Sequence, residues 1–333
     1  MTDERVGAPR VRTVFLGSGA FAVPTLRALV AHPDVDVVAV VTAPPRPAGR
    51  RLDPNPTPVE HAARELGIRS ILTPARLSAP KSIAAILVLD PGRAVLADYG
   101  QIVPGALLEM PHGALNLHPS LLPRHRGATP VPAAILAGDT ETGVTLMQMD
   151  AGLDTGPLVA QVRRALDGTE TTPSLEAELA IAAAALLADN LGPWLRGELE
   201  ARPQSDEGVT LTRPLRREDG RLDPTRDAVA LERQIRAYQP WPGSFVDTPQ
   251  GRLVIWSASV ATGKPEGPAT VAGDGAALAS APGTFDLEGL SVGRGERLVL
   301  HEVQPAGGKR MSWVAYVRGR PGIVSATVLN GGA

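Results

Sequence analysis

The sequence predicts an α/β protein in which a mostly parallel sheet is followed by a smaller all-β domain. Two apolar runs rich in β-branched residues, 11–16 and 35–41, flank a helical segment and form a β-α-β pattern. Beyond about residue 240 the apolar runs become short and alternate with turn residues, as in a small barrel or sandwich. The 333 residues leave room for about two domains of ordinary size.

The composition is that of a soluble globular chain, with 43% apolar and 20% charged residues. No uninterrupted apolar run approaches the length of about 20 residues that spans a bilayer. The first dozen residues are polar and are not followed by the apolar centre of a signal peptide. We therefore expect a cytoplasmic protein that has no membrane partner.

The absence of cysteine excludes disulfides, thiolate catalysis and cysteine-ligated zinc. The six histidines include no pair with the i, i+4 spacing of the helical zinc motif, so we expect no metal. A formal net charge of −2 gives no global sign of a polyanionic partner, although it leaves room for a local basic loop.

The first β-α-β unit begins with strand 11–16 and a glycine-rich turn. Helix 24–30 follows, with Pro24 in its first turn. Strand 35–41 is almost continuously β-branched, which indicates a strand buried on both faces. Prolines and arginines then dominate residues 42–58, a composition that continues neither helix nor strand, so we expect an exposed loop there.

The remaining periodic segments extend the α/β pattern and then leave it. Further helices of the first domain are predicted at residues 59–66, 80–89, 104–110, 130–136 and 174–187. Its further strands are predicted at residues 70–72, 94–97, 114–117, 143–149 and 158–162. We expect residues 1–199 to form the first domain, 200–208 a linker and 209–333 the second domain. In the second domain we expect one helix, 231–238, and short strands at 253–258, 269–271, 297–303 and 313–317.

The turn after the first strand, residues 17–22, satisfies the permissive dinucleotide fingerprint G-x-G-x-x-A. A nicotinamide site also needs an acidic residue at the end of the second strand. Here that strand ends at Val41, and the acids Asp34 and Asp36 lie at its start. We interpret the glycines as allowing close packing of strand and helix, with a nicotinamide oxidoreductase as the alternative.

The strand at 114–117 leads into the stretch in which we expect the chemistry. Residues two apart on a strand face the same side, so Asn116 and His118 can address one reacting group. Ligands of open α/β sheets collect at the carboxyl ends of such strands. Each residue alone also has a structural explanation, an asparagine that closes a turn and a histidine bonded to backbone. We expect His125, between two arginines, to be solvated.

A later turn supplies a carboxylate that completes a catalytic set. Acyl transfer to an amine needs a donor for the oxyanion, a proton acceptor and a carboxylate that orients the acceptor. Asn116, His118 and Asp154 provide one each. Asp150 competes for the carboxylate role, but it more simply ends a strand, so we prefer Asp154.

Three arginines, Arg46, Arg50 and Arg51, lie in the proline-rich segment. Such a cluster is usually a solvated surface, and binding of a phosphate is the more specific alternative interpretation. A loop of this length inside a compact domain is more often functional than not.

Several motifs together resemble one family. The shared ones are Asn116-Leu117-His118, Ser120-Leu121-Leu122-Pro123 and Asp154-Thr155-Gly156. The narrower ones lie at residues 46–50, 138–145, 147–150, 234–238 and 241–242. On these residues the chain resembles, over nearly all its length, the family of methionyl-tRNA formyltransferases within the folate-dependent formyltransferases.

The resemblance implies a Rossmann-like formyltransferase domain followed by an OB-like β-barrel domain that assists tRNA binding. It implies 10-formyltetrahydrofolate as the formyl donor and the methionine amine of initiator methionyl-tRNA as the acceptor, in translation initiation. The folate-binding residues that it implies are Ser120, Leu121, Leu122, Pro123, Tyr99, Gly100, Gln101, Ile102 and Val103. Arg50, with Arg46 and Arg51, would contact the tRNA. We expect a monomer.

Two positions depart from the family's pattern. The arginine loop lacks the lysines that commonly follow it, and Asp98 stands where a small apolar residue is usual. Two rivals remain beside the oxidoreductase: a formyltransferase acting on an amino-sugar nucleotide, and an RNA-binding protein without catalysis. The complete Asn-His-Asp set argues against the second.

Overall fold

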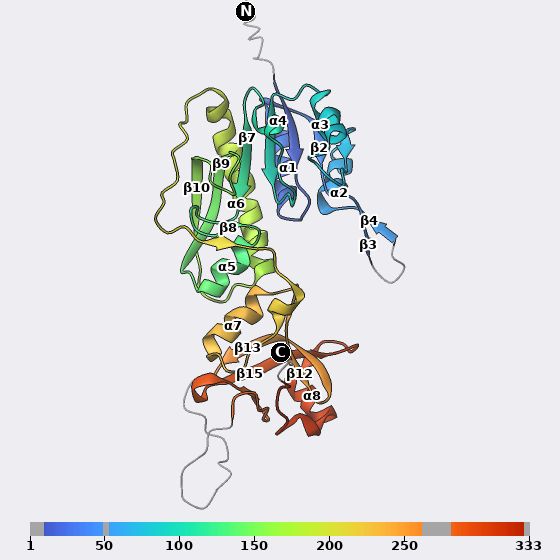
Figure 1. Cartoon of the computed structure of the whole chain (residues 1–333), viewed down its shortest axis with the longest axis vertical. Helices are drawn as coiled ribbons and strands as arrows, with labels where there is room; N and C mark the ends of the chain where they lie inside the picture. Colours follow the sequence, from blue (N-terminus) through green and yellow to red (C-terminus); the bar gives the residue numbers. More distant parts are fainter. Residues whose placement is uncertain (1–9, 49–52, 262–280, 330–333) are drawn as a thin grey trace, which may run out of the picture. The chain divides into compact units, whose positions relative to one another are not determined.

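The computed structural model describes residues 10–48, 53–261 and 281–329, and the chain divides into two compact units (Figure 1). The first unit comprises residues 1–130, 141–166 and 174–213. The second comprises residues 131–140, 167–173 and 214–333. In the described ranges no helix is long and apolar enough to cross a membrane.

A seven-stranded, mostly parallel sheet forms the centre of the first unit, with the strand order β10-β9-β7-β6-β1-β2-β5. Its strands are β1 (Val11–Leu16), β2 (Val35–Val41), β5 (Ile71–Leu72), β6 (Arg93–Ala97), β7 (Ala114–His118), β9 (Glu141–Gln148) and β10 (Leu158–Ala165). The first five named are parallel, β9 runs antiparallel to β7, and β10 runs antiparallel to β9.

Helices flank this sheet (Figure 1). They are α1 (Ala22–Ala31), α2 (Pro58–Glu65), α3 (Pro80–Leu87), α4 (Gly105–Leu108) and α6 (Thr172–Leu195), while most of α5 (Pro130–Ala137) belongs to the second unit. Helix α2 begins where Thr57 accepts a 3.0 Å hydrogen bond from the Glu60 N–H, which satisfies one free donor of its first turn. Buried aliphatic side chains such as Leu16, Val41 and Leu96 form a core between sheet and helices.

The chain reverses its direction across the sheet at β1, since β2 lies on one side of β1 and β6 on the other. Such a switch point opens a crevice at the carboxyl ends of the strands. The turn after β1 needs glycine because an added Cβ at Gly17 would lie 2.8 Å from the Ala97 carbonyl oxygen and 2.9 Å from Ala22 Cβ. The glycines therefore permit close packing at this point.

The prediction that residues 42–58 are only an exposed loop is wrong in part. Strands β3 (Arg46–Ala48) and β4 (Asp53–Asn55) pair in an antiparallel ribbon, with Pro47 opposite Pro54. A two-stranded ribbon has two free edges, so its prolines need not donate to a neighbouring strand. This is why a proline-rich segment can still be extended and paired.

The second unit is an antiparallel half-barrel. Its strands are β12 (Ser244–Thr248), β13 (Gly251–Val260), β14 (Gly289–Ser291), β15 (Arg297–Pro305) and β16 (Met311–Ser312), in the order β12-β13-β15-β14 with β16 beside β15. Helix α7 (Ala228–Ala237) begins at Asp227, whose carboxylate accepts from the Ala230 N–H at 2.7 Å. Leu231 and Ile235 of α7 join the core of this unit.

One predicted strand of this unit is a helix. Residues 313–317 were expected to be extended, but α8 (Trp313–Gly319) covers them. Ser312 accepts from the Ala315 N–H at 3.2 Å, and the rings of Trp313 and Tyr316 stack with centroids 5.7 Å apart. The N-cap and the i, i+3 aromatic pair favour a helix in a run too short for periodicity to decide. The strand expected at 269–271 lies outside the described residues.

The fold-class prediction is confirmed: a mostly parallel α/β unit precedes a smaller β unit. The expected linker at 200–208 stays a prediction. Part of that segment is tied to the first unit, where Arg202 pairs with Leu158. Just beyond it, β11 (Leu211–Thr212) pairs in parallel with β8 (Arg126–Gly127).

Candidate active site

The imidazole of His118 is buried at the carboxyl end of β7, with 4% of the residue exposed. Its Nε2 lies 2.9 Å from the backbone carbonyl oxygen of His125. Because a carbonyl oxygen only accepts, Nε2 must carry the proton. In the neutral ring the lone pair therefore belongs to Nδ1, which is the atom able to take up a proton.

The carboxylate of Asp154 faces that second nitrogen. Its Oδ2 lies 3.7 Å from His118 Nδ1, which is too long for a direct hydrogen bond but close enough for charge attraction when the imidazole is protonated. The same oxygen accepts the Gly127 N–H at 2.8 Å. Gln204 Nε2 donates to the Asp154 carbonyl oxygen at 2.7 Å. The Gly127 N–H thus holds the carboxylate, and Gln204 holds the backbone of the turn that carries it, independently of the imidazole.

The surroundings of His118 set its protonation. Burial lowers the pKa of His118 below its ordinary value, and the nearby Asp154 carboxylate opposes this only in part. At neutral pH the imidazole is consequently uncharged and has a vacant Nδ1. Once protonated, it would face a carboxylate already in position.

The structure separates the two candidate carboxylates. Asp150 Oδ1 accepts from the Gly152 N–H at 2.9 Å and from Thr155 Oγ1 at 2.7 Å. These bonds hold the turn before Asp154, and Asp150 itself is exposed. Asp154 adopts a positive φ of 52° in that turn, and of the two acids it is the one beside the imidazole.

Asn116 is half-buried in the middle of β7, between Leu96 of β6 and Met147 of β9. Its side-chain amide makes no hydrogen bond with any residue in the described part of the chain. It lies two residues before His118 on one strand, so the pleat directs both side chains to one face. A donor that is fixed by its strand and has no protein partner is available to a ligand.

The segment Ser120–Pro123 is held by its own polar groups. Ser120 is fully buried, and its Oγ donates to the Arg124 carbonyl oxygen at 2.7 Å. Thr145 Oγ1 donates to the Ser120 carbonyl oxygen at 2.6 Å and accepts from the Leu122 N–H at 3.2 Å. Leu122 is also buried. The half-buried side chains of Leu121 and Pro123 are left for contact with a ligand.

The residues of the second predicted folate-binding segment, 99–103, differ in their roles. Gln101 bridges a neighbouring loop, since its Oε1 accepts from the Leu77 N–H at 2.7 Å and its Nε2 donates to the Pro74 carbonyl oxygen at 3.1 Å. Burial raises the pKa of Tyr99 to about 12. Ile102 is 89% exposed, so its side chain is available to a ligand. Gly100 and Val103 complete this segment.

The expectation that His125 is solvated is wrong, because only 5% of it is exposed. It has a positive φ of 58°, and its N–H donates to Thr210 Oγ1 at 2.7 Å. This conformation presents its carbonyl oxygen to His118. Together with Gln204, these groups support the site and were missed from the sequence, because a backbone acceptor and a distant amide leave no local signature.

The glycine-rich turn after β1 is occupied by a protein carboxylate. An added Cβ at Gly19 would lie 1.7 Å from Asp98 Oδ2, and the Ser18 N–H donates to the Asp98 carbonyl oxygen at 2.9 Å. Desolvation by its surroundings raises the pKa of Asp98. A dinucleotide needs this space for its pyrophosphate, so the turn disfavours the nicotinamide alternative.

The predicted tRNA contacts are only partly described. Arg46 begins β3, and the structure does not describe its side chain. Arg50 and Arg51 lie outside the described residues.

Within the described ranges no cluster of three or more His, Asp or Glu residues could hold a metal ion.

Both parts of the chain match protein families. Residues 11–191 match the Formyl transferase family, and residues 214–321 match the Formyl transferase C-terminal domain. The methionyl-tRNA formyltransferase of Chloroflexus aggregans is 43% identical over 93% of this chain and 97% of its own. That of Myxococcus xanthus is 42% identical over 93% of this chain and 95% of its own.

Solved structures share the fold at low identity. The methionyl-tRNA formyltransferase of Clostridium thermocellum matches with a TM-score of 0.51 and 16% identity, over 76% of this chain and 95% of its own. An N-formyltransferase of Helicobacter canadensis, in complex with folinic acid and dTDP-3-aminofucose, matches with a TM-score of 0.59 and 15% identity, over 87% and 98%. The sequence relatives are far closer, and on them the chain belongs to the formyl transferase family, in the group of methionyl-tRNA formyltransferases.

Proposed function

We propose that this enzyme transfers the formyl group of 10-formyltetrahydrofolate to the amino group of initiator methionyl-tRNA, giving N-formylmethionyl-tRNA. One observation carries the chemistry: a buried, neutral His118 faces Asp154, next to the unpartnered amide of Asn116 on the same strand. The choice of acceptor is supported by relatives of that name at 42–43% identity over nearly the full chain.

In the reaction the methionyl amine attacks the formyl carbon, and a new C–N bond forms. The carbonyl oxygen becomes an oxyanion, to which the Asn116 amide donates. His118 Nδ1 takes the proton that leaves the attacking nitrogen. The C–N10 bond of the tetrahedral adduct then breaks, and N10 of the tetrahydrofolate product receives a proton. No covalent bond to the enzyme is required.

Asp154 has a supporting role in this scheme. With the Nε2 proton of His118 committed to the His125 carbonyl oxygen, protonation at Nδ1 gives an imidazolium 3.7 Å from the carboxylate. Opposite charges at that distance in a buried site attract strongly. A water molecule between the two groups would serve equally as a proton relay.

The donor site that we propose lies along two segments. Leu121 and Pro123 offer apolar contact from the loop after β7, and Ile102 offers it from the loop after β6. Both loops follow carboxyl ends of parallel strands, the edge at which ligands bind in such sheets. Ser120, Leu122 and Gln101 would act by holding these loops in place, since their polar atoms or side chains are already engaged.

The tRNA contacts that we propose involve Arg46, Arg50 and Arg51, with assistance from the second unit. Guanidinium groups suit the phosphates of an acceptor end. Because the whole chain carries a net charge of −2, any attraction for tRNA must come from such local clusters.

The decisive experiment transfers labelled formyl from 10-formyltetrahydrofolate to charged initiator tRNA. Uncharged tRNA controls for the amine, and an amino-sugar nucleotide controls for the rival acceptor. We expect label only on the charged tRNA. Transfer to the sugar nucleotide alone would support the rival, and the absence of any transfer to charged tRNA would overturn the proposal.

A further inference from the structure

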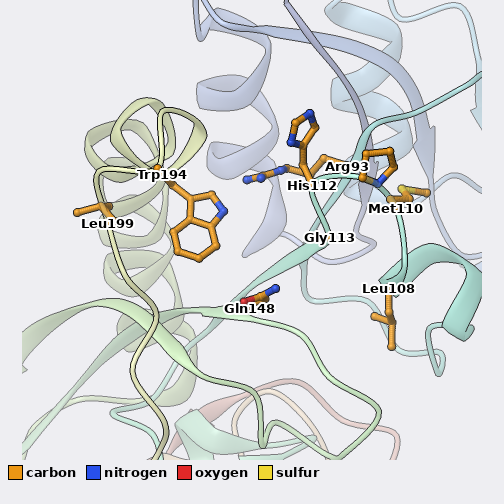
Figure 2. A pocket seen from close by; sticks show the side chains of 10 residues that line it. Arg93, Leu108, Met110, His112, Gly113, Gln148, Trp194 and Leu199 are labelled. Atoms are coloured by element: carbon orange, nitrogen blue, oxygen red, sulfur yellow. The ribbon is translucent and has the colours of Figure 1, made fainter.

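A cavity of about 420 Å³ lies at the amino-terminal ends of β6 and β7, whereas the candidate active site lies at their carboxyl ends (Figure 2). Arg93 begins β6, Gly113 directly precedes β7, and Gln148 ends the antiparallel β9, so all three lie at the same edge. Trp194, in the last turn of α6, lines the other side. The volume is that of a site for a small molecule.

Arg93 is the unusual group in this wall. Only 3% of the residue is exposed, and its Nε and Nη1 are buried without a hydrogen-bond partner in the described part of the chain. No described acid forms an ion pair with it. Buried charges in proteins are normally paired, so this cation lacks a counterion.

The cation persists at neutral pH. Burial lowers the pKa of Arg93 to about 10, which still leaves the guanidinium charged near pH 7. An anion against the Arg93 guanidinium would therefore compensate its charge. A guanidinium fork matches the paired oxygens of a carboxylate or a phosphate.

The rest of the lining suits an organic anion. Figure 2 shows the guanidinium of Arg93 extending toward the indole of Trp194, with Gln148 below both in this view. Neither the Trp194 indole N–H nor the Gln148 amide bonds to another residue in the described ranges. A flat ring can stack on the indole while polar substituents reach Gln148.

We propose that this cavity binds a small organic anion, whose carboxylate or phosphate pairs with Arg93 and whose flat ring lies against Trp194. The ligand must be small because the guanidinium is too buried for a phosphate of an RNA bound at the surface to reach. The cavity is distinct from the formyl-transfer site: from Gly113 to His118 the chain runs five residues, about 16 Å, along β7.

Isothermal titration calorimetry on the full chain tests the proposal with four probes. AMP carries a phosphate and a ring, benzoate a carboxylate and a ring, inorganic phosphate the anion alone and adenosine the ring alone. We expect AMP or benzoate to bind more tightly than inorganic phosphate, and adenosine to bind least. If neither AMP nor benzoate binds, the proposal is overturned.

Variants locate the site. Arg93→Met should abolish binding, and Arg93→Lys, which keeps the charge without the fork, should weaken it about tenfold or more. Trp194→Ala should weaken it, and Trp194→Phe should largely restore it. Arg69→Met removes an exposed arginine of the same unit as the matched control. If Arg93→Met fails to fold, Arg93→Lys decides, and binding unchanged in Arg93→Lys would overturn the proposal.

Formyl transfer measured on the same proteins separates this inference from the proposed function. We expect Arg93→Lys to keep transfer within about twofold, since the cavity lies away from the reacting groups. Binding that is lost while transfer persists supports two sites. Probe binding that persists while initiator tRNA with 10-formyltetrahydrofolate abolishes it, in unaltered enzyme and Arg93→Lys alike, would assign the probes to the transfer site and overturn the proposal.

Discussion

The imidazole of His118 is oriented by the His125 carbonyl oxygen, although a carboxylate lies beside it. This arrangement separates two tasks that one residue often combines. The carbonyl fixes the ring and its tautomer, and Asp154 provides negative charge for the state in which the ring is protonated. At the scale of single residues, the mechanism that we propose therefore depends on a backbone atom as much as on the three side chains.

Asn116 is the first residue to test. Asn116→Ala removes the proposed oxyanion donor and should lower the transfer rate about 10²–10³-fold. Since the side-chain amide of Asn116 makes no hydrogen bond to the described residues, the unfolding temperature should change little. Steady-state transfer kinetics and circular dichroism measure the two quantities. Near-full activity in a folded variant would remove Asn116 from the mechanism.

The pH profile tests the pair formed by His118 and Asp154. Transfer should fall on the acid side as His118 becomes protonated, with an apparent pKa below the ordinary histidine value because burial disfavours the charged ring. Asp154→Asn removes a charge that raises this pKa, so the acid limb should move to lower pH while the rate falls about tenfold or more.

His118→Gln keeps a polar side chain but cannot accept a proton, and it should lose about 10²–10⁴ in rate together with the acid limb. An Asp154→Asn profile whose acid limb does not move, measured under single-turnover conditions, would show that the carboxylate does not act through His118.

Glu176 links stability to pH. Desolvation, and then the neighbouring Asp98 carboxylate, raise the pKa of Glu176 from 4.5 to about 7. The folded state thus holds this proton more tightly than the unfolded chain, and stability is lost as pH rises from about 4.5 through 7. Glu176→Gln should be more stable than the unaltered protein at pH 8. The gain should be less than about 1 kcal/mol because, although neighbouring groups desolvate the carboxylate, the residue as a whole is exposed and water screens its charge.

Denaturant titrations at pH 5 and pH 8 measure that difference. Glu178→Gln is the control, since that carboxylate pairs with Arg164 at 2.8 Å and its loss should not stabilise at either pH. Equal stabilisation by Glu176→Gln at both values would contradict the assignment.

At the scale of elements, the short pairing of β8 with β11 positions the carboxylate of Asp154, for which we propose the catalytic role. Gly127, at the end of β8, donates its N–H to Asp154 and pairs with Thr212 of β11. Its φ is 105°, and an added Cβ would lie 2.3 Å from the Thr212 carbonyl oxygen. Neither the space nor the conformation admits a side chain.

Gly127→Ala should therefore lower stability by about 1–3 kcal/mol and reduce kcat, because the strand must shift away from Asp154. Gly208→Ala is the matched control: its φ is 76°, but the space around it is open. That variant should lose about 1 kcal/mol at most and keep its kcat. Equal kcat in the two variants would show that the β8 position does not matter to catalysis.

At the scale of the whole molecule, a chain with a net charge of −2 must recognise a polyanion through local charge. In the first unit the two sites lie at opposite ends of the parallel strands. The Asn116–His118–Asp154 set lies toward the carboxyl ends, and the Arg93 cavity lies at the amino-terminal ends. The second unit has its own core, so it folds around contacts separate from those of the catalytic sheet.

Replacing Arg46, Arg50 and Arg51 together by alanine should weaken binding of initiator tRNA and reduce the slope of log K against log salt by up to about three. Filter-binding or fluorescence titrations at several salt concentrations measure the slope. Replacement of Arg10, Arg69 and Arg76, three exposed arginines of the first unit, provides a control of equal charge change. An equal loss in both variants would show that the ribbon contributes only bulk charge.

The sequence alone determined the α/β class, most strands of the first sheet and the composition of the candidate site. Strands such as β1 and β2 were predictable because continuous apolar runs can only be buried, and the Asn-x-His spacing follows from the two-residue period of a strand. Helix α8 and the β3–β4 ribbon were not, because short segments take their conformation from caps and pairing that lie outside them.

Only the tertiary structure decided how the site is held. It distinguished Asp154 from Asp150, buried His125 and turned its carbonyl oxygen to His118, and joined Arg93 with Trp194 around one cavity. These groups are far apart in the chain or belong to the backbone, which is the same for every residue type. A sequence fixes which chemical groups are available, whereas distance, desolvation and the direction of backbone groups arise only when the chain has folded.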